Sequence, residues 1–150
     1  MNLKIYLAGS CSSEKRTMMQ KIAELLRSEG YTVYCPFELK IPNAWDMSQE
    51  DWANKVFNAD LDALDSCNLF LMITPGRHST AGTNWEQGYA FAKGIPSAVF
   101  QYTDDNTSPM TYCAADDFIN CTNEQDLLEK IVFWIHEGLP QRDVCLTTLT

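Results

Sequence analysis

Asn68-Leu-Phe-Leu-Met-Ile-Thr74 is the stretch of this 150-residue chain that decides its fold. It has the length of a β-strand, and its five central residues are all apolar. A strand that is apolar on both faces is typical of a parallel sheet with helices packed on each side. The run therefore predicts the centre of an α/β domain.

Strand-like and helical segments alternate on both sides of this run. Further strands are predicted at residues 3–8, 31–35, 97–102 and 118–119. Apolar residues at helical spacing predict helices that end at Gly30, begin after Ser48, begin near Thr83 and begin after Asn123. Residues 103–115 are expected to be a loop, and residues 138–150 a possible tail. The core face expected for the second helix is Trp52, Val56, Phe57, Leu61 and Leu64.

This order of elements predicts a flavodoxin-like (Rossmann-like) doubly wound sheet of about five mainly parallel strands, with helices on both faces. In the strand order 2-1-3-4-5 the winding reverses between strands one and three, and ligands bind at that point. The loops that meet there are residues 9–13 and 74–86, so a site is predicted between them. Residues 1–150 contain no repeat or second domain and are expected to form a single domain.

The chain is acidic, with a formal net charge of -9. Nucleic acids and anionic membranes attract clustered Lys and Arg, so neither is expected as a partner. No apolar run approaches the ~18 residues of a membrane helix, and no secretory signal is evident at the start. We therefore expect a cytoplasmic location.

Cysteine and glycine patterns give no indication of a metal or cofactor. The six cysteines form no C-x-x-C pair, and neither His78 nor His136 lies at zinc-ligand spacing from a cysteine pair. Free thiols are therefore expected. The chain has no G-x-G-x-x-G motif, no complete P-loop and no serine nucleophile elbow, which disfavours dehydrogenase, kinase and esterase functions.

Three polar residues occupy apolar surroundings near the predicted crevice. Glu86 falls in the first turns of a helix beside Trp85, where the helix dipole stabilises an anion by ~0.3–1 kcal/mol. Asp60 lies at or beside an apolar stripe, and a buried charge there needs a partner or a chemical role. Tyr6 is near the end of the first strand. Simpler interpretations stay open: a surface glutamate, a boundary aspartate and a core tyrosine.

The two facing loops are rich in groups that can hold an anion. In the first loop the candidates are Gly9, Ser10, Ser12, Ser13 and Arg16, just before a helix whose free N–H groups suit a phosphate. In the second loop they are Ser79, Thr80 and Gly82, since glycine lets the backbone approach a ligand. Ordinary N-capping by Ser12 or Ser13 is the alternative. His78 is expected to be an exposed loop residue rather than a general base.

Three segments together resemble the nucleoside 2-deoxyribosyltransferase family. They are Ile5-Tyr-Leu-Ala-Gly9, Asn58-Ala-Asp-Leu61 and Ala81-Gly-Thr-Asn-Trp-Glu-Gln-Gly-Tyr-Ala90. The resemblance implies that Glu86 attacks the anomeric carbon and forms a covalent sugar–enzyme ester. It also implies that Asp60 helps to protonate the leaving base and that Tyr6 orients the nucleophile. Such a two-step displacement needs one carboxylate at the sugar and one proton donor at the base.

One position departs from the transferases of this family. They place an aspartate six residues before the nucleophile, where this chain has Thr80. The related 2′-deoxynucleoside 5′-phosphate N-hydrolases carry a hydroxyl residue there, which contacts phosphate. The resemblance further implies a pocket built across a dimer interface with the loop after the fourth strand, which here carries Ser108 and Thr111.

The sequence therefore predicts an enzyme that cleaves the N-glycosidic bond of 2′-deoxynucleosides and transfers the deoxyribosyl group to another nucleobase. Its expected partners are a nucleoside or nucleotide, a nucleobase and a second copy of the chain. The first alternative is hydrolysis of nucleoside 5′-monophosphates to free base and sugar phosphate. The second is a non-catalytic nucleotide sensor that does not depend on Glu86.

Overall fold

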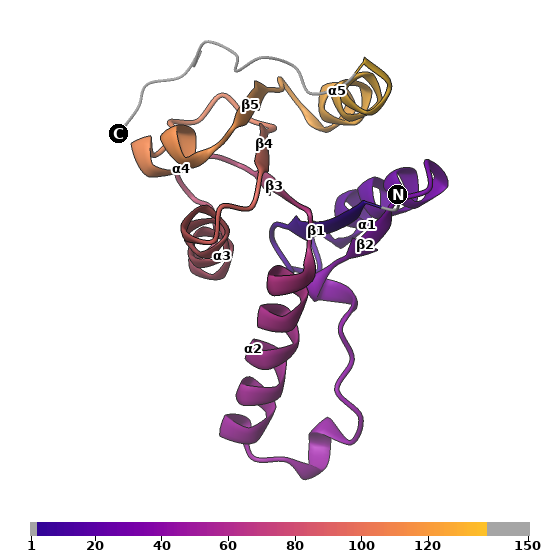
Figure 1. The fold of residues 1–150 in the computed structure, drawn as a ribbon, viewed down its shortest axis with the longest axis vertical. Coiled ribbons are helices and arrows are strands. Elements are labelled where there is room, and N and C mark those ends of the chain that lie inside the picture. The colour runs from indigo at the N-terminus through magenta and orange to yellow at the C-terminus, as the bar shows by residue number, and fades with distance from the viewer. Residues whose placement is uncertain (1–2, 138–150) are drawn as a thin grey trace.

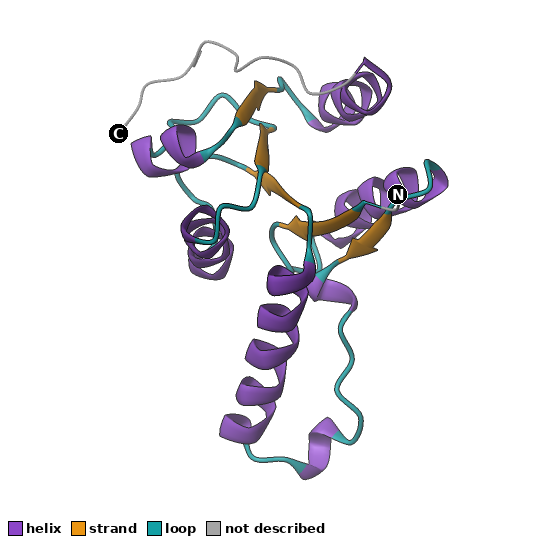
Figure 2. Cartoon of the chain, in the orientation of Figure 1, coloured by secondary structure: helices purple, strands orange, loops and turns teal. Residues whose placement is uncertain are grey.

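The computed structural model describes residues 3–137 and contains one five-stranded parallel sheet (Figure 1; Figure 2). Its strands are β1 (Lys4–Ala8), β2 (Thr32–Tyr34), β3 (Leu69–Thr74), β4 (Ser97–Gln101) and β5 (Asp117–Asn120). Its α-helices are α1 (Arg16–Ser28), α2 (Gln49–Ser66), α3 (Ala81–Ala92), α4 (Pro109–Ala114) and α5 (Glu124–Glu137). Two short 3₁₀ turns, η1 (Pro36–Glu38) and η2 (Ala44–Asp46), precede α2. The strand order β2-β1-β3-β4-β5 confirms the predicted topology.

Alternating side chains of the strands build two separate cores. Ile5 and Leu7 of β1 face one side, where the buried residues of α1 and α5 pack against the sheet. Tyr6 and Ala8 face the other side, where Leu64 of α2 belongs to the same cluster. This alternation follows from the two-residue period of a strand. The helices of the fold therefore cover both faces of the sheet, as predicted.

The predicted core face of α2 is wrong over most of its length. Leu64 is buried, but the side chains of Trp52 and Phe57 are 46% and 48% exposed. An 18-residue helix is about 27 Å long, whereas the six residues of β3 span about 20 Å. The first half of α2 therefore extends beyond the sheet together with the segment that precedes it (Figure 1).

The segment 103–115 contains a short helix, where the sequence predicted only loop. Pro109 stands at the first turn of α4, and the Ser108 hydroxyl accepts a hydrogen bond from the Met110 backbone N–H at 3.2 Å. Proline at the first helical turn after a serine N-cap is a favourable start, which the interpretation of this segment overlooked. The predicted tail at 138–150 lies outside the described residues.

Five of the six cysteines lie in the described segment. Cys11, Cys35, Cys67, Cys113 and Cys121 are free. Between residues 3 and 137, no group of three His, Cys, Asp or Glu side chains is arranged to hold a metal ion. No helix in the same segment is both long enough and apolar enough to span a bilayer.

Candidate active site

A cavity of about 630 Å³ opens where the loops after β1 and β3 meet, at the predicted reversal of the strand order. Its walls come from the β1–α1 loop, the segment after β2, the middle of α2 and the first turns of α3. The lining residues are Gly9, Ser10, Cys11, Ser12, Pro36, Phe57, Asp60, Leu61, Leu64, Thr80, Gly82, Thr83, Trp85 and Glu86. The two carboxyl groups singled out in the sequence therefore face the same largely apolar space.

Glu86 is held in this cavity by Tyr6. The Tyr6 side chain is fully buried beneath the pocket, and its hydroxyl donates a hydrogen bond to Oε2 of Glu86. Burial raises the pKa of the Glu86 carboxyl to about 7, whereas the Tyr6 hydrogen bond favours the ionised form. Glu86 is thus not the solvent-directed helix-start glutamate of the simpler interpretation. Its environment is that of a carboxyl group that titrates near neutral pH.

Asp60 is held in the same way by Tyr34. The Tyr34 hydroxyl donates to Oδ1 of Asp60 at 2.7 Å. Burial raises the pKa of Asp60, and the hydrogen bond from Tyr34 acts in the opposite direction. Burial, then the bond to Asp60, raises the pKa of Tyr34, so the phenol keeps its proton and remains a donor. Asp60 has a partner, as a carboxyl group beside an apolar stripe requires.

Of the first-loop candidates, Gly9, Ser10 and Ser12 line the cavity, whereas Ser13 and Arg16 do not. The Ser10 hydroxyl donates to the Ser12 hydroxyl at 3.0 Å and accepts from the Ser12 backbone N–H at 3.2 Å. The alternative of N-capping by Ser12 or Ser13 is wrong, because Lys15 is the N-cap of α1 and no side chain caps it. The hydroxyls of Ser10 and Ser12 are instead at the mouth of the pocket.

Of the second-loop candidates, Thr80 and Gly82 line the cavity and Ser79 does not. Thr80 is the N-cap of α3: its hydroxyl accepts from the Thr83 backbone N–H at 3.4 Å and lies 2.7 Å from the Thr83 hydroxyl. Thr111 is buried in α4, outside the lining, and its carbonyl accepts from Nε2 of Gln87 at 2.9 Å. Substrate contact stays a prediction for all of these candidates, and the four residues outside the lining are Ser13, Arg16, Ser79 and Thr111. His78 is exposed, as expected.

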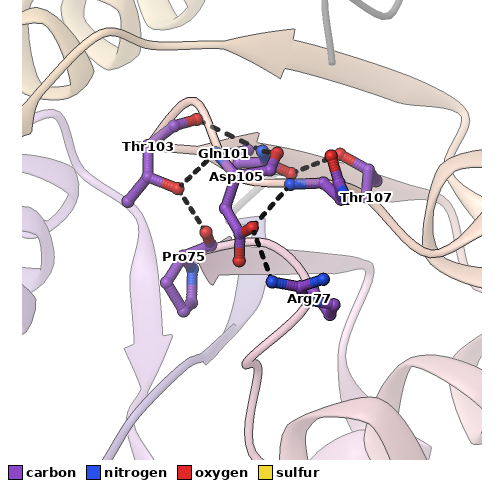
Figure 3. A network of polar contacts seen from close by, with 7 residues as sticks. Pro75, Arg77, Gln101, Thr103, Asp105 and Thr107 are labelled. Carbon is purple, nitrogen blue, oxygen red and sulfur yellow. Dashed lines mark hydrogen bonds and ion pairs between the residues drawn. The ribbon is translucent and has the colours of Figure 1, made fainter. Parts of the chain in front are cut away.

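A polar network fixes the loop that leads from β3 to Thr80 (Figure 3). The Gln101 side chain, fully buried, donates from Nε2 to the carbonyls of Thr103 at 3.2 Å and Asp105 at 2.7 Å. Its Oε1 accepts from the Thr107 hydroxyl at 2.6 Å. The Thr103 hydroxyl donates to the Pro75 carbonyl. The β4–α4 loop is thereby tied to the β3–α3 loop.

The same two loops meet a second time at Arg77. Its backbone N–H donates to the Asn106 carbonyl at 2.7 Å, and its guanidinium lies 3.5 Å from Oδ1 of Asp105 (Figure 3). Gly76 has a φ of +108°, and a Cβ at this position would lie 2.8 Å from the Asn106 carbonyl oxygen. Only glycine fits that close approach with that backbone. The start of α3, and with it Glu86, is therefore supported from the β4 side.

The sequence interpretation missed several residues of the site. Tyr34, Cys11 and Thr83 were not singled out, and Phe57 and Leu61 were assigned to the core although they line the cavity. Tyr34 had a usable signal, because the first two predicted strands each carry a tyrosine near the carboxyl end. Cys11 and Thr83 had none beyond their proximity to residues already named.

A flavodoxin-like sheet with two tyrosine-held carboxyl groups in one largely apolar cavity is typical of a class of protein: a small α/β enzyme with its site at the reversal of the strand order. A sequence model of the nucleoside 2-deoxyribosyltransferase family matches residues 5–129, and the chain belongs to that family. It is accordingly an enzyme of the kind that transfers glycosyl groups or cleaves N-glycosidic bonds. No match is found among curated proteins.

Solved structures share the fold over nearly their whole length. The 2-deoxyribosyltransferase of Bacillus psychrosaccharolyticus is 24% identical, with a TM-score of 0.73 over 94% of this chain and 98% of its own. The CMP N-glycosidase of Clostridium botulinum is 23% identical, with a TM-score of 0.64 over 87% and 98%. A conserved protein from Enterococcus faecalis is 21% identical, with a TM-score of 0.55 over 89% and 99%.

Proposed function

We propose that this chain cleaves the N-glycosidic bond of 2′-deoxynucleosides with Glu86 as nucleophile and transfers the deoxyribosyl group to another nucleobase. The observation that carries the proposal is the position of Glu86: it lies inside the cavity, bonded to Tyr6, with Asp60 in the same cavity. Within residues 3–137 no salt bridge to Glu86 is observed, and burying such a carboxyl group is costly to the fold, which supports a chemical role.

The reaction proceeds in two displacements. A Glu86 oxygen attacks the anomeric carbon, and the electron pair of the breaking C–N bond stays on the base, which takes a proton from Asp60. The product is an ester between Glu86 and the sugar. A nitrogen of the second base then attacks the same carbon, its proton passes to the Asp60 carboxylate, and Glu86 is released. Two inversions give net retention.

The carboxyl pair must carry one proton for the first step, and that proton must be on Asp60. Burial raises the pKa of Glu86 to about 7, so in the free enzyme Glu86 holds a proton up to neutral pH, and turnover requires the proton on Asp60 instead. A base bound over Asp60 excludes water there and raises its affinity for the proton, while the electron-poor anomeric carbon favours ionised Glu86. Substrate binding thus puts the proton where turnover needs it.

The cavity wall suits a nucleobase. Trp85 lies in the lining and stacks on Tyr89 with ring centroids 5.5 Å apart, and Phe57 meets the edge of Trp85 at 5.5 Å. Aromatic surfaces of this kind bind flat heterocycles by stacking. Ser10, Ser12 and Thr80 also line the cavity and offer hydroxyl groups to the 5′ end of the sugar.

Hydrolysis of a nucleoside 5′-monophosphate is the second candidate, and Thr80 favours it. A carboxylate at this position would repel a phosphate, whereas the Thr80 hydroxyl can donate to one. Ser10 and Ser12 face the same space. In this reaction water, rather than a second base, resolves the ester on Glu86.

One experiment separates these functions. The protein is incubated with a deoxynucleoside and with its 5′-monophosphate, each with and without a second free base, and the products are separated by chromatography. A new nucleoside indicates transfer, and free base with free sugar or sugar phosphate indicates hydrolysis. Glu86→Ala should abolish either reaction, whereas Glu14→Ala, at an exposed glutamate, should not. Wild-type binding without turnover would overturn the proposal in favour of a sensor.

A homodimer and a cytoplasmic location are part of the same proposal. Trp52 and Phe57 on α2 and Trp85 and Phe91 on α3 are between 46% and 65% exposed. A second copy of the chain would cover these rings and close the open side of the cavity. Light scattering after size-exclusion chromatography should give twice the mass of the chain. A monomer at micromolar concentration would contradict the dimer.

A further inference from the structure

Two tyrosines lie side by side beneath the two carboxyl groups. Tyr6 of β1 and Tyr34 of β2 are partners in the register of this parallel pair. Side chains at paired positions point to the same face of a sheet, so both rings are directed toward the face that bears α2 and α3. Their centroids are 5.4 Å apart, with 29° between the ring planes, and Tyr6 also stacks on Phe70 at 5.8 Å. The rings form a row across three strands.

Each tyrosine reaches a carboxyl group on a different helix. Tyr6 donates to Glu86 on α3, and Tyr34 donates to Asp60 on α2. Both helices have capped starts, but along α2 only Leu64, one turn beyond Asp60, is fully buried against the sheet. Within residues 3–137, no hydrogen bond to the Asp60 carboxyl group other than that from Tyr34 is observed. The orientation of Asp60 thus depends on Tyr34.

We infer that Tyr34 is the positioning residue for the acid step: it holds Oδ1 of Asp60 so that Oδ2 faces the leaving base, and it stabilises the carboxylate left after proton transfer. The inference rests on the proposed function and extends it to a residue outside the cavity lining. In this step the Oδ2–H bond breaks and a bond from hydrogen to the base forms. The electron pair of the C–N bond stays on the base. Tyr34 keeps its own proton throughout.

A purely structural role for Tyr34 predicts something different. Phenylalanine would retain the ring and its stacking on Tyr6, so Tyr34→Phe removes the hydroxyl alone. If the hydroxyl served only to hold α2 against β2, its loss would slow all substrates alike or weaken their binding. If it serves the acid step, its loss matters only for bases that must be protonated to leave.

The test uses two pairs of substrates that differ in this requirement. In the purine pair, 2′-deoxyguanosine needs protonation, whereas the cationic base of 7-methyl-2′-deoxyguanosine leaves without it. In the pyrimidine pair, 2′-deoxyuridine needs protonation more than 5-nitro-2′-deoxyuridine, whose base is a stable anion. The pair that the wild type prefers is used, and kcat for base release is measured. Circular dichroism checks that each variant is folded.

Tyr34→Phe should lower kcat about 10- to 100-fold on the substrate that needs protonation and less than about threefold on the other, with little change in KM. Asp60→Asn should show the same selectivity with a larger loss. Tyr31→Phe, a matched change three residues earlier, should leave both rates unchanged. Equal losses on both substrates, or no loss, with an active wild type would overturn the role of Tyr34 and leave the proposed function standing. An inactive wild type would overturn both.

Discussion

Replacing Glu86 by glutamine should stabilise the folded chain at alkaline pH while abolishing the proposed chemistry. Glutamine has nearly the same shape, keeps an oxygen that can accept the Tyr6 hydrogen bond, and carries no charge. The wild-type carboxylate is destabilised by burial, which raises its pKa to about 7. Removing the charge therefore removes the free-energy cost of burying the Glu86 carboxylate in the folded chain.

The size of the gain follows from the two protonation equilibria. In the unfolded chain the carboxyl group titrates at its ordinary value of 4.5, and in the folded chain at about 7. Between these values the folded state holds a proton that the unfolded state has released, so wild-type stability falls as pH rises through this window. At 1.36 kcal/mol per pH unit the full difference is about 3 kcal/mol above pH 7. At pH 5 less than about 1 kcal/mol is present.

Urea unfolding of the wild type and Glu86→Gln at pH 5 and pH 8 measures this difference. We expect the variant to be more stable by about 2–3 kcal/mol at pH 8 and by less than about 1 kcal/mol at pH 5. Glu14→Gln, at an exposed site, should change stability little at either pH. Equal stability of the wild type and Glu86→Gln at pH 8, or the same gain at both pH values, would refute the argument from burial.

Three further outcomes are expected. The value of kcat/KM should fall about tenfold per pH unit above about 7, because the carboxyl pair then loses its proton; initial rates from pH 6 to 9 check this, and a flat profile would contradict it. Thr80→Asp should lower kcat/KM for a 5′-monophosphate at least tenfold, with a smaller change for the nucleoside, since a carboxylate repels phosphate; equal losses on both substrates would count against a phosphate contact. Gly76→Ala should cost about 1–3 kcal/mol in urea unfolding. Gly30→Ala is the matched comparison, because its φ is also positive at +93° but nothing lies within 4 Å of an added Cβ, so a smaller loss there isolates the contact with Asn106.

The fold was largely predictable because its signals are local. The apolar run at β3 and the alternation of strands with helical periods require a covered parallel sheet, and the observed strand order agrees. The failure at α2 has a physical cause. A helical stripe such as Phe57, Leu61 and Leu64 shows that one face is apolar, but not what covers it. Here a cavity meets Phe57 and Leu61, and only Leu64 reaches the sheet core.

Residues of the candidate site could be predicted where the residue type is unusual for its local sequence. Glu86 and Asp60 stand out because carboxyl groups beside apolar stripes need a reason. Tyr34 does not stand out in this way, because a tyrosine in a strand is ordinary; its one signal was its place near the carboxyl end of the strand. The role inferred for Tyr34 rests on the pairing of β1 with β2 and on the approach of α2 to β2, two facts about segments distant in sequence.

Two preferences of the proposed enzyme depend on the cavity: base or water as the acceptor, and a 5′-hydroxyl or a 5′-phosphate on the substrate. In the proposed function, stacking of a second base on Phe57 and Trp85 favours that base over water as the acceptor for the ester on Glu86. In the proposed function, the hydroxyls of Ser10, Ser12 and Thr80, which also line the cavity, contact the 5′ end of the sugar and select between a 5′-hydroxyl and a 5′-phosphate. Ser10 and Ser12 lie in the β1–α1 loop, whereas the two rings lie on α2 and α3, so changes at these two serines can alter substrate preference without altering acceptor preference. A cavity that accepts a 5′-phosphate is therefore compatible with transfer to a second base, and a cavity that accepts a 5′-hydroxyl is compatible with hydrolysis.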